Sequence, residues 1–252
     1  MIFDYRKGEA AQRLMELTEQ AIRSSSAYTM PALGEVQFQQ VHQDGERFMY
    51  SKEEDNFLMF AYLPKYNTRK YKSLPRFHPF LCKVREEYSG YVFSPKMPVN
   101  IWCKDDNRSL EGENLSMCKQ CQSKATRSLF GARGELPWYE YVIREASQER
   151  PIKSDGYIDL WRQVSEAVRE KASWTCQQCK IKLPLPVKGF YLEVHHRDHN
   201  KKNNSESNLV ALCVACHAFQ DEVHRKNYST GPNSLKLKGF TELRAAWSSG
   251  PV

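Results

Sequence analysis

The chain has 252 residues, of which 40% are hydrophobic, 27% charged and 12% aromatic, so a packed core is expected over most of its length and a disordered chain is excluded. No apolar run approaches the roughly 18 to 20 residues of a membrane span, and the first residues lack the apolar region of a secretory signal, so we expect a cytoplasmic protein without membrane association. A net charge of +7 permits an anionic partner such as a nucleic acid.

The first part of the chain has the patterns of a mixed α+β domain. Apolar positions recur at helical spacing over residues 10–22. Short runs typical of strands follow at 36–38, 48–50, 57–62, 91–93 and 99–102, with Asp44-Gly45 as a turn between the first two. We therefore predict an α+β domain over residues 1–150, with a binding, targeting or regulatory role.

A polar stretch with Pro151 and Gly156 predicts a domain boundary. Beyond it a helix is expected over 157–172, followed by a small unit from Trp174 to about His224. Gly231-Pro232-Asn233 breaks the chain, and a short terminal helix is expected over 241–247. The predicted divisions are therefore a second domain at 151–230 and a tail at 231–252.

Six of the eight cysteines form three Cys-x2-Cys pairs, and two of these pairs predict a zinc site. Two thiolates at that spacing can reach one tetrahedral ion from a single turn. Only 33 residues separate the last two pairs, so they can close one four-cysteine site that leaves no position for a substrate. The expected ligands of this structural zinc are Cys176, Cys179, Cys213 and Cys216.

Histidines between and after these pairs predict a second, open metal site. A strand-like segment ends in His195 and His196, and a helix is expected to begin at His217 and to include His224. Asp221 would lie four residues along the same helical face as His217. Nitrogen and oxygen ligation by His195, His217 and Asp221 suits a catalytic divalent ion. His199 and His224 are predicted to be surface histidines.

Taken together, these motifs resemble the HNH endonuclease family, in its four-cysteine zinc branch. The match runs through Cys-x2-Cys, Val-His-His, Asn-Leu and Leu-Cys-x2-Cys-His, over roughly 157–225. The resemblance implies a ββα-metal fold in which His196 is the general base and Asn208 orients its imidazole. It further implies His195 and His217 as metal ligands, while Asp221 stands where one branch of the family has histidine.

The resemblance implies hydrolysis of DNA phosphodiester bonds, on duplex DNA, with Mg²⁺ or Mn²⁺ as the catalytic ion. An imidazole with a pKa near 6.5 can accept a proton from water at neutral pH. A compact nuclease with an additional zinc-containing domain resembles the accessory nucleases of restriction or anti-phage defence systems such as Zorya or Septu. We therefore expect an antiviral endonuclease or nickase with protein partners from such a system.

The amino-terminal half predicts a second zinc site around Cys118 and Cys121. Cys82 and Cys103 would complete a four-cysteine set, whereas His78-x3-Cys82 offers a second workable spacing in which His78 replaces Cys103. Both ligand sets remain open on the sequence alone.

Two groups of basic residues are candidates for phosphate binding. No Asp or Glu occurs from Asn56 through Arg85, where cations alternate with aromatic residues that can stack on bases. A second group lies beside the predicted active site and would position the backbone of a nucleic acid. The candidates are Arg69, Lys70, Lys72, Arg76, Arg197, Lys201 and Lys202.

Two other functions fit the same motifs. The first is a non-catalytic zinc module that binds nucleic acid or serves as an adaptor, although such a module does not need His196 or Asn208. The second keeps the hydrolytic chemistry but acts on RNA.

Overall fold

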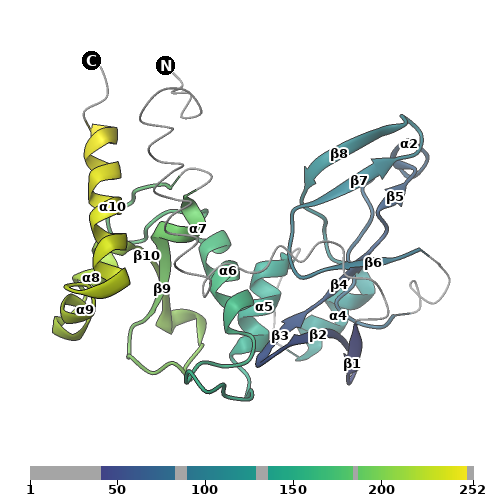
Figure 1. Ribbon diagram of the computed structural model, residues 1–252. Coiled ribbons are helices and arrows are strands. Elements are labelled where there is room, and N and C mark those ends of the chain that lie inside the picture. Colours follow the sequence, from purple (N-terminus) through teal and green to yellow (C-terminus); the bar gives the residue numbers. More distant parts are fainter. Residues whose placement is uncertain (1–40, 83–89, 129–135, 184–186, 249–252) are drawn as a thin grey trace. The chain divides into compact units, whose positions relative to one another are not determined.

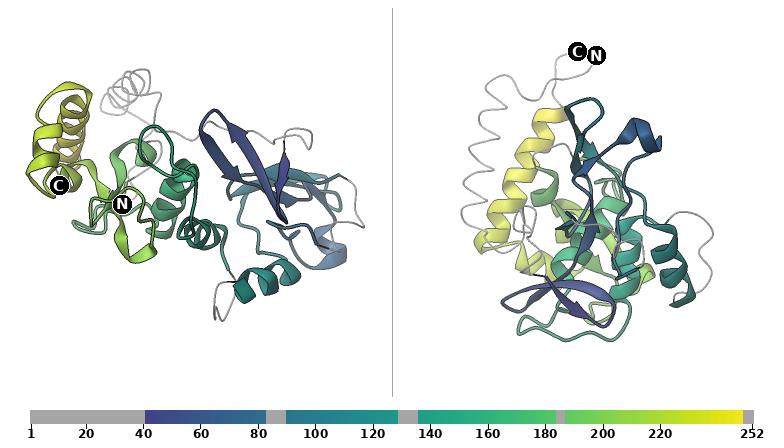
Figure 2. Two further views of the ribbon diagram at one scale, coloured as in Figure 1. Left: turned by 90° about the horizontal axis from the view of Figure 1, so that it is seen from below. Right: turned by 90° about the vertical axis from the view of Figure 1, so that its right-hand side faces the viewer.

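The structure is a computed structural model that describes residues 41–82, 90–128, 136–183 and 187–248 (Figures 1 and 2). The predicted helix at 10–22 and strand at 36–38 lie outside these residues. The described residues contain both helices and strands, which confirms the α+β class. Among them, every helix is too short or too polar to cross a membrane.

Contacts divide the chain into two compact units. The first, which we call the sheet unit, comprises the described residues 41–82, 90–128, 136–167 and 200–208. The second, which we call the hairpin unit, comprises residues 168–183, 187–199 and 209–248. This division falls inside one helix, and the domain limits expected at 150 and 230 stay predictions.

The sheet unit begins with an antiparallel meander of β1 (His42–Asp44), β2 (Arg47–Lys52) and β3 (Asp55–Leu58), purple in Figures 1 and 2. Gly45 turns the chain between β1 and β2 with φ +59°, a conformation that glycine adopts without strain. Met49 then pairs with Leu58 across β2 and β3, so that both side chains are buried.

Further short strands complete this unit. β4 (Phe60–Tyr62) pairs with β6 (Val92–Ser94), while β5 (Lys65–Tyr66), β7 (Val99–Cys103) and β8 (Arg108–Glu113) form a second three-stranded sheet. A four-residue helix, α2 (Thr68–Tyr71), follows β5. The strand-like runs predicted at 57–62 and 99–102 therefore form strands in the structure.

Aromatic side chains fill the core of the sheet unit. Phe48 and Phe93 meet edge to face at 5.2 Å, and Phe60 contacts both Phe77 and Tyr141. Tyr141 comes from α5 (Trp138–Ala146), and α4 (Lys119–Ser128) also belongs to this unit.

One buried amide holds α6 (Trp161–Lys171) to the strands of the sheet unit. Gln163 is fully buried, and its side chain accepts a hydrogen bond from Leu58 N at 2.8 Å. The same amide donates to the carbonyls of Leu58 and Pro95. These bonds satisfy backbone groups that would otherwise be buried without a partner.

The hairpin unit contains α7 (Lys188–Tyr191), β9 (Leu192–His196), β10 (Leu209–Cys213), α8 (Val214–Ala218), α9 (Glu222–Asn227) and α10 (Gly231–Ser248) (Figure 1). β9 and β10 pair in antiparallel fashion, with Leu192 opposite Cys213 and His196 opposite Leu209. All five residues of β10 are buried, as its continuous apolar sequence favours.

Two helix predictions in this unit were wrong. The single helix expected from His217 through His224 is interrupted, because α8 ends at Ala218 and the Asp221 side chain caps a new helix by accepting from His224 N at 2.8 Å. The break expected at Gly231-Pro232-Asn233 is the start of α10, because proline fits the first turn of a helix.

Candidate functional site

Four cysteines of the hairpin unit gather into one cluster. The Sγ atoms of Cys176, Cys179, Cys213 and Cys216 all lie within 4.8 Å of one another, and all four thiols are free. Backbone hydrogen bonds fold the first pair into a tight turn, with Cys176 N donating to Ile181 O at 2.9 Å and Lys180 N donating to Cys176 O at 2.9 Å. The second pair lies where β10 passes into α8.

The spacing of these thiols fits a tetrahedral zinc ion. Zn–S bonds of about 2.3 Å place two thiolate sulfurs about 3.8 Å apart, and Cys179 Sγ lies 3.6 Å from Cys213 Sγ. The hydrogen bond between Cys176 and Cys213 lowers the pKa of the Cys176 thiol to about 4 and raises the pKa of the Cys213 thiol, so it favours a thiolate at Cys176. The predicted four-cysteine set is therefore assembled in one place and can hold zinc.

Three histidines of the hairpin unit form a second cluster that could hold a metal ion. His195 comes from β9, His217 from α8 and His224 from α9, and their ligand atoms lie within 4.8 Å of one another. The ring of His195 lies 5.2 Å from that of His217 and 4.9 Å from that of His224. The structure thus unites the predicted His195 and His217 with a histidine that the sequence placed at the surface.

The environment of His195 keeps its imidazole neutral. Burial, followed by the nearby His217, His224 and His199, lowers the pKa of His195 to about 4. A neutral imidazole is the form that binds metals. At neutral pH, His195 is therefore in the form required of a ligand.

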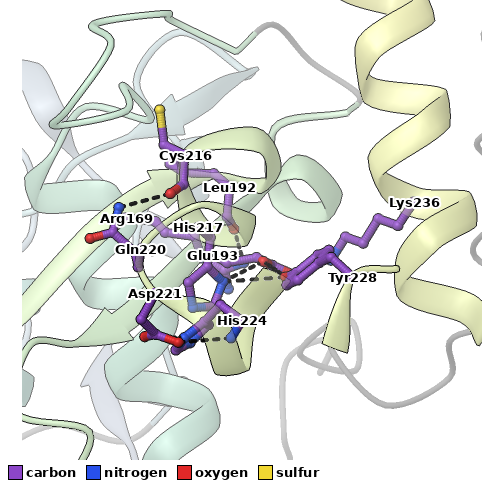
Figure 3. Close-up of polar contacts among 10 residues, drawn as sticks. All are labelled: Arg169, Leu192, Glu193, Cys216, His217, Gln220, Asp221, His224, Tyr228 and Lys236. Atoms are coloured by element: carbon purple, nitrogen blue, oxygen red, sulfur yellow. Dashed lines mark hydrogen bonds and ion pairs between the residues drawn. The ribbon is translucent and has the colours of Figure 1, made fainter. Parts of the chain in front are cut away.

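Glu193, which the sequence did not single out, fixes the orientation of His217 (Figure 3). Its carboxylate lies 2.7 Å from His217 Nδ1 and also accepts the hydroxyl of Tyr228. Lys236 of α10 reaches the other carboxylate oxygen at 2.5 Å. Burial alone would raise the pKa of Glu193, but the Lys236 ammonium and His217 outweigh it and hold this pKa well below its usual range.

An ionised carboxylate can only accept hydrogen bonds, so the contact selects the neutral tautomer of His217 with its proton on Nδ1 and the lone pair on Nε2. A carboxylate behind the ligating histidine is a common arrangement at metal sites, where it fixes the ring and raises its basicity.

Asp221 has a comparable relation to His224. Its carboxylate lies 2.6 Å from His224 Nδ1 and 3.6 Å from His199 Nδ1. Asp221 groups with His199 and His224 as possible ligands, whereas the group that contains His195 and His217 does not include it. The Asp221 carboxylate therefore caps α9 and orients His224, and its role as a metal ligand stays a prediction.

The structure places the predicted general base, His196, in β9 and its predicted orienting residue, Asn208, at the end of a short 3₁₀ helix (Glu206–Asn208). His196 is buried at the end of β9, opposite Leu209, and Asn208 directly precedes Leu209. Asn208 is itself buried, and its side-chain amide donates to Asn203 O at 2.7 Å. The roles expected of His196 and Asn208 stay predictions.

Two of the predicted phosphate-binding residues contact other groups of the chain through their charged ends. Arg69 pairs with Asp106 at 2.5 Å, and Lys201 donates to Asp155 O while its ammonium lies 4.2 Å from the centre of the Tyr157 ring. The side chains of the remaining candidates are exposed, namely Lys70, Lys72, Arg76, Arg197 and Lys202.

Of the two ligand sets considered for the amino-terminal zinc, the structure gathers the one with His78. The ligand atoms of His78, Cys82, Cys118 and Cys121 lie within 4.8 Å of one another. Cys103 belongs instead to a different contact, with its Sγ atom 2.8 Å from Thr68 Oγ1.

Comparison with known proteins finds similarity in the region that contains the last two cysteine pairs. Residues 176–219 match the family model described as HNH endonuclease, which confirms the resemblance seen in the sequence. A segment of 67 residues is 34% identical to the Zorya protein ZorE of Escherichia coli strain ATCC 8739. This segment covers 27% of the present chain and only 18% of that relative. No solved structure matches the chain significantly.

Proposed function

We propose that the chain is a metal-dependent HNH endonuclease or nickase that hydrolyses phosphodiester bonds of DNA. The observation that carries this proposal is the convergence of His195, His217 and His224 from β9, α8 and α9. His195, His217 and the neighbouring His196 lie inside the matched region. A purely structural zinc module has no use for such a cluster beside its four cysteines.

The residues present fit a divalent ion at the histidine cluster. His195, His217 and His224 would hold it, and a divalent ion bound there supplies charge stabilisation to the phosphate and to the departing oxygen. Glu193 and Asp221 keep the Nδ1 atoms of His217 and His224 occupied, so that both Nε2 atoms remain for ligation. The site is thereby preorganised by groups that do not touch the substrate.

His196 would act as the general base. Its imidazole accepts a proton from the attacking water, a contribution of roughly 10²–10⁴-fold to the rate. Asn208 would hold that imidazole in the productive orientation, and the exposed Arg197 and Lys202 would contact backbone phosphates. We place this activity in anti-phage defence on the strength of the local similarity to ZorE, with other components of such a system as protein partners.

A plasmid assay tests the proposal. Purified full-length chain is incubated with supercoiled plasmid in Mg²⁺, Mn²⁺ or EDTA, beside the variants His196→Ala and His42→Ala. His42 is an exposed residue of β1 in the sheet unit and serves as the matched control. We expect nicked or linear product with a divalent ion, no product in EDTA, and loss of cleavage in His196→Ala alone.

Other outcomes distinguish the remaining functions. Normal cleavage by His196→Ala would overturn the assignment of the base. Retardation of plasmid without cleavage under any ion would favour the non-catalytic zinc module. A parallel arm with single-stranded and duplex RNA identifies an RNA-cleaving enzyme if only those substrates are cut.

A further inference from the structure

A third cluster of metal-binding side chains lies in the sheet unit, outside the matched HNH region. His78, Cys82, Cys118 and Cys121 are all buried, with exposed fractions of 2%, 5%, 6% and 0%. His78 Nδ1 lies 3.2 Å from Cys82 Sγ and 3.8 Å from Cys121 Sγ. Zinc bound tetrahedrally by one imidazole and thiolates places such nitrogen and sulfur atoms about 3.6 Å apart, midway between these values.

The backbone brings the four ligands together from two parts of the chain. His78 is bridged to Ala61 by a reciprocal pair of hydrogen bonds at 2.9 and 2.8 Å, which ties it to β4. Phe77 accepts from Cys118 N at 2.9 Å, so the two ligand-bearing segments run side by side just before α4. Cys121 then follows in the first turn of that helix.

The residue types in this cluster favour a bound metal over disulfide bonds or a set of hydrogen-bonded thiols. Its three cysteines form no disulfide, and an odd number of thiols cannot all be consumed in disulfides within the set. Three buried thiols around one imidazole would make only weak hydrogen bonds with each other. One imidazole and three thiolates, in contrast, form one of the closed tetrahedral donor sets of structural zinc.

We propose that His78, Cys82, Cys118 and Cys121 bind a second structural zinc ion, and that Cys103 does not take part. The ion joins the segment from His78 to Cys82 to the start of α4. Phe80, between the two ligands of that segment, packs edge to face on Tyr141 of α5 at 5.6 Å. This zinc would therefore support the aromatic core of the sheet unit, as the four-cysteine zinc supports the hairpin unit.

Zinc content of the full-length chain tests this proposal independently of nuclease activity. Elemental analysis of purified wild-type protein should give two zinc ions per chain. His78→Ala and Cys121→Ser should each retain one, whereas Cys103→Ser, the matched cysteine control, should retain two. Cys213→Ser should also retain one, which assigns the remaining ion to the other cluster.

The wild-type measurement alone can overturn the proposal, even if a variant does not fold. A single zinc per wild-type chain refutes the second site. Loss of a zinc in Cys103→Ser but not in His78→Ala refutes the ligand set. Iron in place of the second zinc refutes the identity of the metal. Cobalt substitution provides a second readout, since the visible spectrum of Co²⁺ distinguishes a site with three thiolates and an imidazole from one with four thiolates.

Discussion

Removal of the charge on Glu193 tests whether the site depends on groups that do not contact the ion. Glu193→Gln keeps an oxygen that can accept from His217 Nδ1, but it removes the negative charge that raises the basicity of that ring. Loss of such an orienting carboxylate weakens metal affinity by about 10–100-fold. That change corresponds to about 1.4–2.7 kcal/mol of binding free energy.

The same substitution also affects stability, because it removes the carboxylate charge opposite the Lys236 ammonium. The Lys236 and Glu193 side chains are only 12% and 20% exposed. Removal of one partner of a fully buried ion pair costs about 3–5 kcal/mol, and the partial exposure here reduces this to about 2–3 kcal/mol. Addition of Lys236→Met should therefore restore most of the free energy of unfolding without restoring the affinity for the ion.

Mn²⁺ titration of the zinc-loaded chain, followed by the electron paramagnetic resonance signal of free ion, measures the affinity, and denaturant unfolding measures the stability. Glu222→Gln is the control, because this glutamate is exposed in the first turn of α9. We expect it to bind Mn²⁺ like the wild type. The variant His217→Ala should abolish Mn²⁺ binding. If it does, a Mn²⁺ affinity of Glu193→Gln within twofold of the wild type would refute the positioning role of Glu193.

Three further predictions concern the zinc, the core and the binding of DNA. Cys213→Ser should unfold the hairpin unit, with loss of near-ultraviolet circular dichroism and of one zinc, because a small unit without its metal lacks a sufficient core. Gln163→Leu should lower the free energy of unfolding in urea by about 2–5 kcal/mol, since it leaves two buried backbone groups of Leu58 without partners; an unchanged midpoint would contradict this. Arg197→Ala and Lys202→Ala should each reduce the slope of log affinity against log salt for duplex DNA by about 0.9, measured by fluorescence anisotropy, if each side chain contacts one phosphate.

Local spacing was sufficient to predict the four-cysteine cluster and two of the three clustered histidines. Cys-x2-Cys constrains both sulfurs to one turn, whatever the surrounding fold, so Cys176 and Cys179 could be paired without a structure. His195 and His217 can be identified because they belong to the strand and the helix that lie between and directly after the cysteine pairs. Within each Cys-x2-Cys pair, the chemistry depends on residues that are neighbours in the sequence.

Helix periodicity alone does not place His224 in the cluster, because the helix that contains His217 ends before His224. A continuous helix from His217 would place Asp221 on the same face, four residues on. The side chain of Asp221 instead ends that continuity by capping α9, and the chain re-enters a helix with His224 toward the cluster. An acidic residue three positions before a histidine was the available signal, since Asp is a preferred N-cap residue.

The contacts of Glu193 and the choice between His78 and Cys103 depend on tertiary structure and cannot be predicted from residue spacing. Glu193 stands in an apolar strand sequence, and its partners Tyr228 and Lys236 lie 35 and 43 residues away. The choice between His78 and Cys103 likewise depended on strand pairing, which ties His78 to Ala61. No local pattern distinguishes these contacts in advance.

The positions of the carboxylates define the class of ion that the histidine cluster suits. Glu193 and Asp221 are both directed at Nδ1 atoms of histidines, which leaves imidazole nitrogens as the donors of the group formed by His195, His217 and His224. Mg²⁺ prefers oxygen ligands at nearly ideal octahedral positions, whereas Mn²⁺ and later transition ions bind imidazole more readily. The two carboxylate contacts that orient the rings therefore also favour Mn²⁺ over Mg²⁺ at this site. The Mn²⁺ arm of the plasmid assay should show faster cleavage than the Mg²⁺ arm at equal concentration.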